Sequence, residues 1–236
     1  MPLDWERIKA ICFDVDGTLS DTDNHMVASL VKSLRGIRWL IPETAQTQVI
    51  RAVVMTIESP GNFLYNLADR LGIDQTVIKL SDWLNRHTRR RKPEQFWIIP
   101  GVEELLVEFG HRFPLSIVSA RSRLGTEAFL NQFQLSSRFQ AVATSQTCRH
   151  TKPFPDPLLW VAARLDVRAE NCLMVGDTVV DIKAGKAAGA QTAGVLCGFG
   201  TRRELERAGA DILLNSTSDL SESYRSSNHM QKDKLQ

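Results

Sequence analysis

Residues 8–18, IKAICFDVDGT, decide how this chain folds. The first six are a short run rich in strand-forming side chains, which ends at Asp14, and Gly17 follows as a turn residue. The pattern predicts a buried strand over 8–13 with two carboxylates, Asp14 and Asp16, just past its end. In open parallel sheets, ligand sites form outside the carboxyl ends of the strands. These two acids are therefore the first candidates for a functional site.

The segment from about residue 21 to about residue 92 has a different pattern. Its apolar residues recur at intervals of three and four, as at Met26, Leu30 and Leu34. Pro42, Pro60 and other prolines and glycines interrupt the runs. The spacing predicts about four amphipathic helices with no strand among them.

Strands and helices alternate after residue 100. The predicted strands span 114–118, 139–143, 172–175, 192–196 and 211–214. The predicted helices span 102–109, 124–133, 179–188 and 202–208, and one more opens at Asp156 as N-cap with Pro157 as its first residue. Such alternation indicates right-handed crossovers and a parallel sheet covered on both faces.

We therefore expect an α/β fold: a doubly wound, mostly parallel sheet core with a smaller all-helical cap domain inserted after the first strand. The catalytic core would comprise residues 1–20 and 93–220, and the cap residues 21–92. Residues 221–236 are polar, rich in serine and aperiodic, which predicts a disordered tail.

Composition and charge narrow the class of protein. The chain is 43% hydrophobic and 24% charged, with a net charge of +2, which is typical of a soluble globular protein and predicts neither a nucleic-acid nor a membrane partner. The four cysteines form no C-x-x-C pair, so we expect free thiols in a cytoplasmic protein. The basic run 87–92 is interpreted as a solvated helix end. A nuclear or nucleic-acid-binding patch and an arginine that faces an anionic substrate are the alternatives.

Chemically active side chains follow the predicted strands and should meet at one edge of the sheet. They are Asp14, Asp16, Ser119, Lys152, Asp177 and Asp181. Crowded carboxylates repel one another unless a cation lies among them, and Mg²⁺ prefers carboxylate, phosphate and water oxygens. A lysine and the backbone amides near Ser119 and Ala120 suit phosphate oxygens. An aspartate can attack phosphorus, while a second carboxylic acid protonates the leaving oxygen.

Four motifs in this order resemble those of the haloacid-dehalogenase-like (HAD) hydrolase superfamily. They are DVDGT at 14–18, Ser119, Lys152 with Pro153, and GDTVVD at 176–181. The stretches PGVEELL at 100–106 and KPFPDP at 152–157 are similar to members with a helical cap, with phosphoglycolate phosphatases closest in general pattern.

The resemblance implies a role for each site residue. Asp14 would be the nucleophile and a magnesium ligand, and Asp16 the general acid and base, binding the metal through its backbone carbonyl. Ser119 would hydrogen-bond the phosphoryl group, and Lys152 would neutralise nucleophile and phosphate. Asp177 would be a metal ligand, and Asp181 either a further ligand or a support for the others.

Asp16 also bears on which reaction is expected. The resemblance implies that dehalogenases lack an acid at this position, because a halide leaves without a proton. We therefore expect a magnesium-dependent phosphatase that hydrolyses a small phosphorylated metabolite through an aspartyl-phosphate, as a monomer or homodimer. A phosphomutase of the β-phosphoglucomutase type is an alternative. A non-enzymatic phospho-accepting or binding module is another, although receiver domains lack both the helical insert and the second acid.

Overall fold

The structure, a computed structural model, describes residues 3–21 and 95–234. Almost all of these residues belong to a single unit of the chain, which comprises residues 1–23 and 96–236. The predicted helical cap, residues 21–92, lies outside the described residues apart from Asp21, as do the basic run 87–92 and its arginines. The cap therefore stays a prediction.

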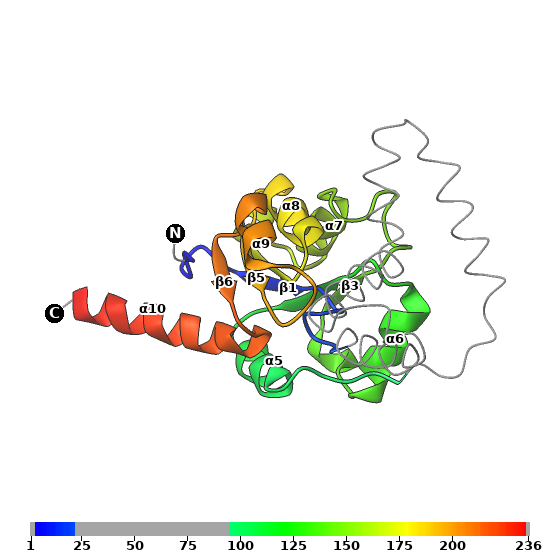
Figure 1. Ribbon diagram of the computed structural model, residues 1–236, viewed down its shortest axis with the longest axis horizontal. Helices are drawn as coiled ribbons and strands as arrows, with labels where there is room; N and C mark the ends of the chain where they lie inside the picture. Colours follow the sequence, from blue (N-terminus) through cyan, green and yellow to red (C-terminus); the bar gives the residue numbers. More distant parts are fainter. Residues whose placement is uncertain (1–2, 22–94, 235–236) are drawn as a thin grey trace, which may run out of the picture. The chain divides into compact units, whose positions relative to one another are not determined.

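Six parallel strands form one sheet in the order β3-β2-β1-β4-β5-β6 (Figure 1). The strands are β1 (Ala10–Phe13), β2 (Leu115–Val118), β3 (Ala141–Ala143), β4 (Cys172–Gly176), β5 (Gln191–Val195) and β6 (Ile212–Leu214). From β1 the chain builds the sheet outward through β2 to β3. It then returns to the other side of β1 and continues through β4 to β6. The strand order thus reverses beside β1, which is where open α/β sheets place their ligands.

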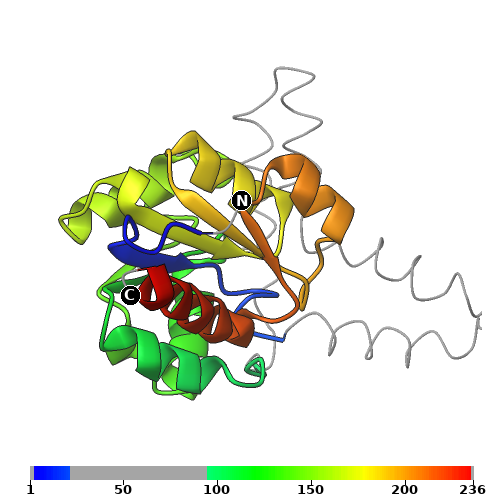
Figure 2. The ribbon, with the colours of Figure 1, turned by 90° about the vertical axis from the view of Figure 1, so that its left-hand side faces the viewer.

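Helices cover both faces of the sheet. They are α5 (Val102–Gly110), α6 (Arg123–Gln132), α7 (Asp156–Arg164), α8 (Val179–Ala187), α9 (Arg202–Ala208) and α10 (Leu220–Lys234), with short 3₁₀ turns at Ser136–Arg138, Ala169–Asn171 and Thr217–Asp219. In Figure 2, α5, α6 and α10 lie on one side of the sheet and α7, α8 and α9 on the other.

The strand residues alternate between these two layers. Ile11 and Phe13 of β1 are buried in a large apolar cluster with residues of α5 and α6, whereas Ala10 and Cys12 belong to a smaller cluster with residues of α7. A strand that is buried on both faces is apolar throughout, so β1 shows no hydrophobic–polar alternation in the sequence. This confirms the predicted doubly wound α/β core.

The predicted core elements are all present, with bounds within two residues of those expected. One detail differs at the start of α7. Asp156 is already the first helical residue, with Pro155 before it and Pro157 in the first turn. Asp156 is therefore not the N-cap, although an acid and a proline in the first turn still suit the unpaired N–H groups there.

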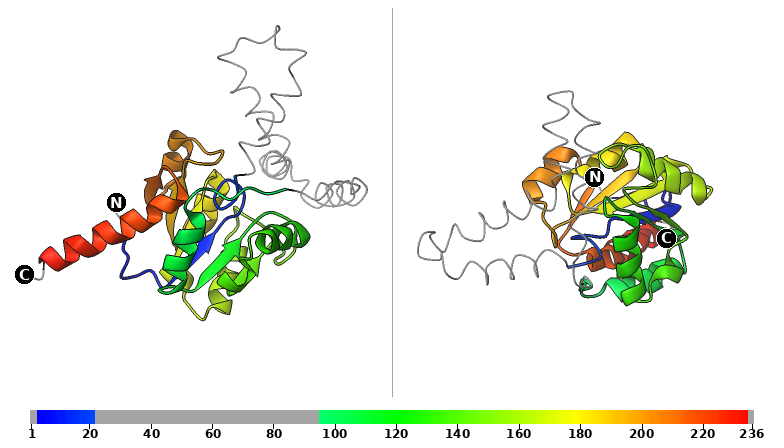
Figure 3. Two further views of the ribbon diagram at one scale, coloured as in Figure 1. Left: turned by 90° about the horizontal axis from the view of Figure 1, so that it is seen from below. Right: turned by 90° about the vertical axis from the view of Figure 1, so that its right-hand side faces the viewer.

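The prediction of a disordered tail over 221–236 is wrong for the residues that the structure describes, because Leu220–Lys234 form the helix α10 (Figure 3). Leu220 is fully buried, and Tyr224, one turn later, packs edge-on against Trp5 and Phe109 with ring centroids 5.0 and 5.8 Å apart. Two apolar residues one helical turn apart hold this helix. Two apolar residues are too few to give a clear helical periodicity in a sequence that is otherwise polar, so the pattern did not predict this helix.

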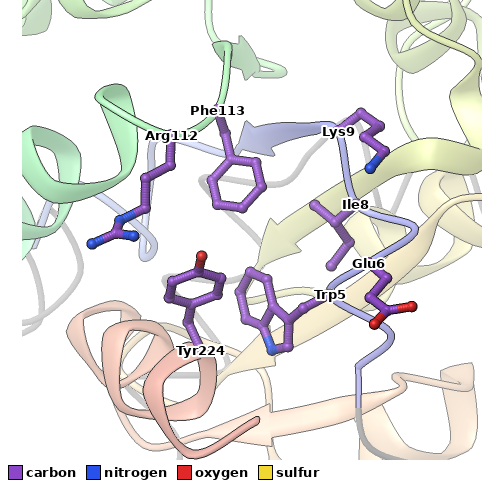
Figure 4. A pocket seen from close by; sticks show the side chains of 7 residues that line it. All are labelled: Trp5, Glu6, Ile8, Lys9, Arg112, Phe113 and Tyr224. Atoms are coloured by element: carbon purple, nitrogen blue, oxygen red, sulfur yellow. The ribbon is translucent and has the colours of Figure 1, made fainter. Parts of the chain in front are cut away.

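A hollow of about 280 Å³ lies beside this aromatic group. Figure 4 shows the side chains that line it, among them Trp5, Phe113 and Tyr224. Residues 5–9 precede β1, whereas Asp14 follows it, so the hollow is at the opposite end of the strand from the predicted site.

No helix in the described part of the chain combines the length and apolar character needed to cross a membrane.

Candidate active site

The carboxyl ends of β1, β2 and β4 carry the predicted site residues. Asp14 follows β1 and continues its ladder, since its N–H donates to the Val175 carbonyl of β4 at 2.9 Å. Asp177 follows β4, and Asp181 is in the first turn of α8. Ser119 follows β2 and is buried, whereas Ala120 next to it is exposed.

The turn after β1 is shaped around one carbonyl group. The N–H groups of Thr18, Leu19 and Ser20 all donate to the Val15 carbonyl, at 3.3, 2.9 and 2.8 Å. Gly17 has φ 74°, a left-handed conformation that glycine adopts without strain. This tight turn keeps Asp14 and Asp16 at the end of the strand.

Lys152 comes from the long connection between β3 and α7 and is 5% exposed. Its Nζ lies 2.7 Å from Oδ1 of Asp14 and 2.5 Å from Oδ1 of Asp181. Burial alone would lower the pKa of Lys152, but the two carboxylates outweigh it and raise the pKa well above the ordinary value. Lys152 is therefore a fixed positive charge beside Asp14.

Three buried carboxylates, those of Asp14, Asp177 and Asp181, have ligand oxygens within 4.8 Å of one another. Burial raises the pKa of Asp14 to about 7, with Asp181 and Asp16 adding to the rise and Lys152 opposing it. Burial, together with the Asp181 and Asp14 carboxylates, also raises the pKa of Asp177 well above its usual value. One lysine thus leaves this cluster short of positive charge.

The loop after β5 holds Asp177. The Phe199 N–H donates to Asp177 Oδ2 at 2.8 Å, and the Gly200 N–H donates to its carbonyl at 3.1 Å. A Cβ at Gly198 would overlap the Asp177 carboxylate, and one at Gly200 would overlap its carbonyl oxygen. Glycine at both positions lets the loop approach this closely.

Asp181 has several partners. Its Oδ1 contacts Lys152, while its Oδ2 accepts the N–H of Thr178 at 2.9 Å and the Thr178 hydroxyl at 2.5 Å. The carboxylate thereby caps the start of α8 as well as contacting Lys152. Both oxygens of Asp181 are engaged, whereas Oδ1 of Asp177 accepts a long bond, 3.4 Å, from Thr18.

Asp16 lies beside a residue that the sequence analysis did not single out, Arg121. The Arg121 side chain donates to both Asp16 oxygens, from Nε at 3.0 Å and from Nη2 at 2.5 Å. Its position two residues after Ser119 was the available signal, but an arginine just before a helix is equally typical of a surface residue. The Phe199 and Gly200 amides were missed because backbone donors leave no mark in a sequence.

The carboxylates and the lysine at the ends of these strands are suited to binding and transforming an anionic substrate. The structure brings Asp14, Lys152, Asp177 and Asp181 together, and places Asp16 on the same turn as Asp14. A donor set of three clustered carboxylates, of which Asp14 and Asp177 have raised pKa values, fits a hard divalent cation such as Mg²⁺, which favours oxygen ligands. Carboxylates and a lysine at one strand edge also suit phosphate chemistry.

Comparison with known proteins gives consistent results. Residues 11–195 match the family described as haloacid dehalogenase-like hydrolase. Pyrophosphatase PpaX from Bacillus cereus is 28% identical over 215 residues, which cover 91% of this chain and 95% of that protein.

Solved structures show the same fold. A hydrolase from Pseudomonas syringae is 27% identical, with a TM-score of 0.67, covering 95% of this chain and 98% of that one. A predicted phosphoglycolate phosphatase from Haemophilus somnus, 18% identical with a TM-score of 0.62, covers 92% and 97%. The family match spans most of the chain, so the expected family and the expected hydrolytic enzyme are confirmed: the chain belongs to the haloacid dehalogenase-like hydrolases.

Proposed function

We propose that this chain is a magnesium-dependent phosphatase that hydrolyses a small phosphate monoester through an aspartyl-phosphate on Asp14. The observation that carries the proposal is the buried cluster of Asp14, Asp177 and Asp181 around Lys152. The similarity to a pyrophosphatase supports phosphorus chemistry and adds pyrophosphate to the candidate substrates.

In the first step, a carboxylate oxygen of Asp14 attacks phosphorus and the bond from phosphorus to the leaving oxygen breaks. Asp16 gives its proton to that oxygen, so the leaving group departs as a neutral alcohol. Lys152, 2.7 Å from Asp14, offsets negative charge on nucleophile and phosphate. Ser119 at the end of β2 would donate a hydrogen bond to a phosphoryl oxygen.

In the second step, water attacks the phosphorus of the aspartyl-phosphate, and Asp16 accepts a proton from that water. Inorganic phosphate leaves and Asp14 is restored. Asp14, Asp177, Asp181 and the Asp16 backbone carbonyl would hold the metal. When bound, Mg²⁺ supplies positive charge to the cluster and to the phosphate oxygens.

We also place the enzyme in the cytoplasm, a proposal supported by four cysteines that are all free thiols.

The test is a panel of phosphorylated metabolites, including pyrophosphate, assayed for inorganic phosphate with and without Mg²⁺. We expect at least one to be hydrolysed in many turnovers, only with Mg²⁺, and Asp14→Asn to abolish the activity. Asp166→Asn is the matched control, because Asp166 is exposed and precedes β4 rather than following it. Single-equivalent phosphate uptake without turnover would contradict the proposal, as would isomer formation from a sugar phosphate without phosphate release.

A further inference from the structure

Arg121 forms an ion pair with Asp16 that joins the end of β2 to the turn after β1. Its Nε and Nη2 donate to the two different oxygens of that carboxylate, at 3.0 and 2.5 Å. Two parallel bonds from a planar guanidinium define the plane of the carboxylate as well as its position. A single-point cation such as lysine could define only the position.

Arg121 is itself held from several directions. Its backbone N–H donates to Ser119 Oγ at 3.1 Å, and its carbonyl accepts the Ser145 N–H at 3.0 Å. Its side-chain carbons lie against the first turn of α6, since a Cβ at Gly125 would come within 2.9 Å of them.

The guanidinium also lies over the Phe96 ring, 5.0 Å from its centroid. Phe96 in turn exchanges two hydrogen bonds with the Gln132 side chain at the end of α6, at 3.2 and 2.8 Å. The orientation of Arg121 is therefore set by α6 and by the strand end, before any substrate arrives.

Asp16 needs such help more than the other acids of the site. Its side chain is 29% exposed, while Asp177 and Asp181 are fully buried among fixed partners. An ion pair that stays partly open to solvent, as this one does, adds little stability. The main effect of the ion pair is therefore to fix the position of the Asp16 carboxylate, because a proton donor acts only within hydrogen-bond reach of the leaving oxygen.

We propose that Arg121 is a positioning residue, which orients the Asp16 carboxylate toward the leaving oxygen and affects the reaction rate through Asp16. This inference rests on the proposed function, in which Asp16 is the general acid. It predicts that Arg121 affects the reaction rate only for substrates whose leaving group needs a proton from Asp16.

The test compares two substrates in the first turnover, so that only formation of the aspartyl-phosphate is measured. An alkyl phosphate that the wild-type enzyme hydrolyses needs a proton on its leaving oxygen, whereas p-nitrophenyl phosphate has a leaving group that departs without one. We expect Arg121→Met to slow the alkyl phosphate about 10- to 100-fold and p-nitrophenyl phosphate less than about threefold. Arg121→Lys should give an intermediate loss.

The decisive comparison adds Arg121→Met to Asp16→Asn. If Arg121 works through Asp16, the double variant reacts with the alkyl phosphate as fast as Asp16→Asn alone. A further loss of more than about threefold in the double variant, or equal losses on both substrates, would overturn the inference and leave the phosphatase proposal standing. A wild-type protein that hydrolyses no ester would instead defeat the proposed function, and this inference with it.

Arg123→Met serves as the matched control. Arg123 is on the same segment and also pairs with a carboxylate, that of Glu127 at 2.7 Å, but its side chain is 74% exposed. Its variant should react like the wild type with both substrates. Thermal unfolding of each variant separates a loss of folded protein from a loss of orientation.

Discussion

At the scale of single residues, Asp177 and Asp181 perform different tasks although both are fully buried acids. Asp181 has its two oxygens bonded to Lys152 and Thr178, so much of its capacity is used within the protein. Asp177 accepts one firm bond, from the Phe199 N–H, and a long one from Thr18. Asp177 therefore has more to offer a cation than Asp181 has.

This difference predicts how Mg²⁺ stabilises variants. At about 100 times its dissociation constant, a ligand adds about 2.7 kcal/mol to the free energy of unfolding, which is about 5–10 °C in Tm for a chain of this size. We expect that rise in the wild type, less than about 1 °C in Asp177→Asn, and an intermediate rise in Asp181→Asn. Differential scanning fluorimetry with and without Mg²⁺ measures it, and Asp166→Asn should behave like the wild type. An unchanged rise in Asp177→Asn would contradict the assignment.

At the scale of elements, the site depends on a loop that has no acidic residue of its own. The stretch Gly198 to Gly200 after β5 carries two N–H groups to Asp177, and it can do so because neither glycine has a side chain. A motif search finds the acids of such a site. It does not find the amides that hold them, since every residue except proline carries one.

Gly200→Ala should therefore damage the metal site, although this residue takes no part in the chemistry. The added methyl group would overlap the Asp177 carbonyl, and we expect a loss of about 1–3 kcal/mol in the free energy of unfolding. The Mg²⁺-dependent rise in Tm should fall with it.

Gly110→Ala is the control for this change. Its Cβ would meet only Leu115 Cδ1, at 3.8 Å, and it ends helix α5, so the variant should be as stable as the wild type or up to about 1 kcal/mol more stable. Chemical denaturation measures both variants. Equal stability and equal Mg²⁺ response in Gly200→Ala would show that the loop adapts.

Helix α10 gives a second prediction at this scale. Tyr224 contacts Trp5, Phe109 and Phe113, and Arg112 lies 5.3 Å from its ring centroid. Because Tyr224 is only partly buried, Tyr224→Ala should lower the free energy of unfolding by about 2 kcal/mol. Tyr224→Phe keeps the ring and should change it by less than about 0.5 kcal/mol. If urea denaturation showed both variants equal to the wild type, α10 would contribute nothing to the stability of the core.

At the scale of the whole molecule, the strand ends were more predictable than the contacts made there. Asp14 and Asp177 follow strands that are buried on both faces, and such strands are visible as apolar runs. A motif identifies Lys152 in the sequence. Its place between Asp14 and Asp181, which lie 138 and 29 positions away along the chain, comes from the order of the strands in the sheet. The Arg121–Asp16 pair, 105 residues apart, is of the same kind. Local pattern predicts elements, and tertiary packing decides which side chains meet.

The raised pKa of Asp14 in the carboxylate cluster makes the free energy of unfolding of the whole protein depend on pH. Asp14 has a pKa of about 7 in the folded protein against 3.8 for an ordinary aspartate, so between these values the folded state holds a proton that the unfolded chain releases. The stability that Asp14 contributes is therefore complete below about pH 3.8 and is lost as pH rises from there to about 7, by at most about 1.4 kcal/mol per pH unit. Acids with lowered pKa, such as Asp211, change stability in the opposite sense at lower pH.

We therefore expect wild type and Asp14→Asn to diverge in EDTA as pH rises from 5 to 8. The free energy of unfolding of the wild type should fall relative to that of the variant, because asparagine carries no charge to desolvate. Subtracting the two curves cancels the shared groups that Asp14 does not influence, and leaves the effect of Asp14 together with that of the neighbours whose pKa it shifts, such as Asp177. Mg²⁺ should reverse the trend, since a cation favours the ionised carboxylates and releases their protons. Urea denaturation at each pH measures the difference, and parallel curves in EDTA would mean that Asp14 is already ionised at low pH in the folded protein.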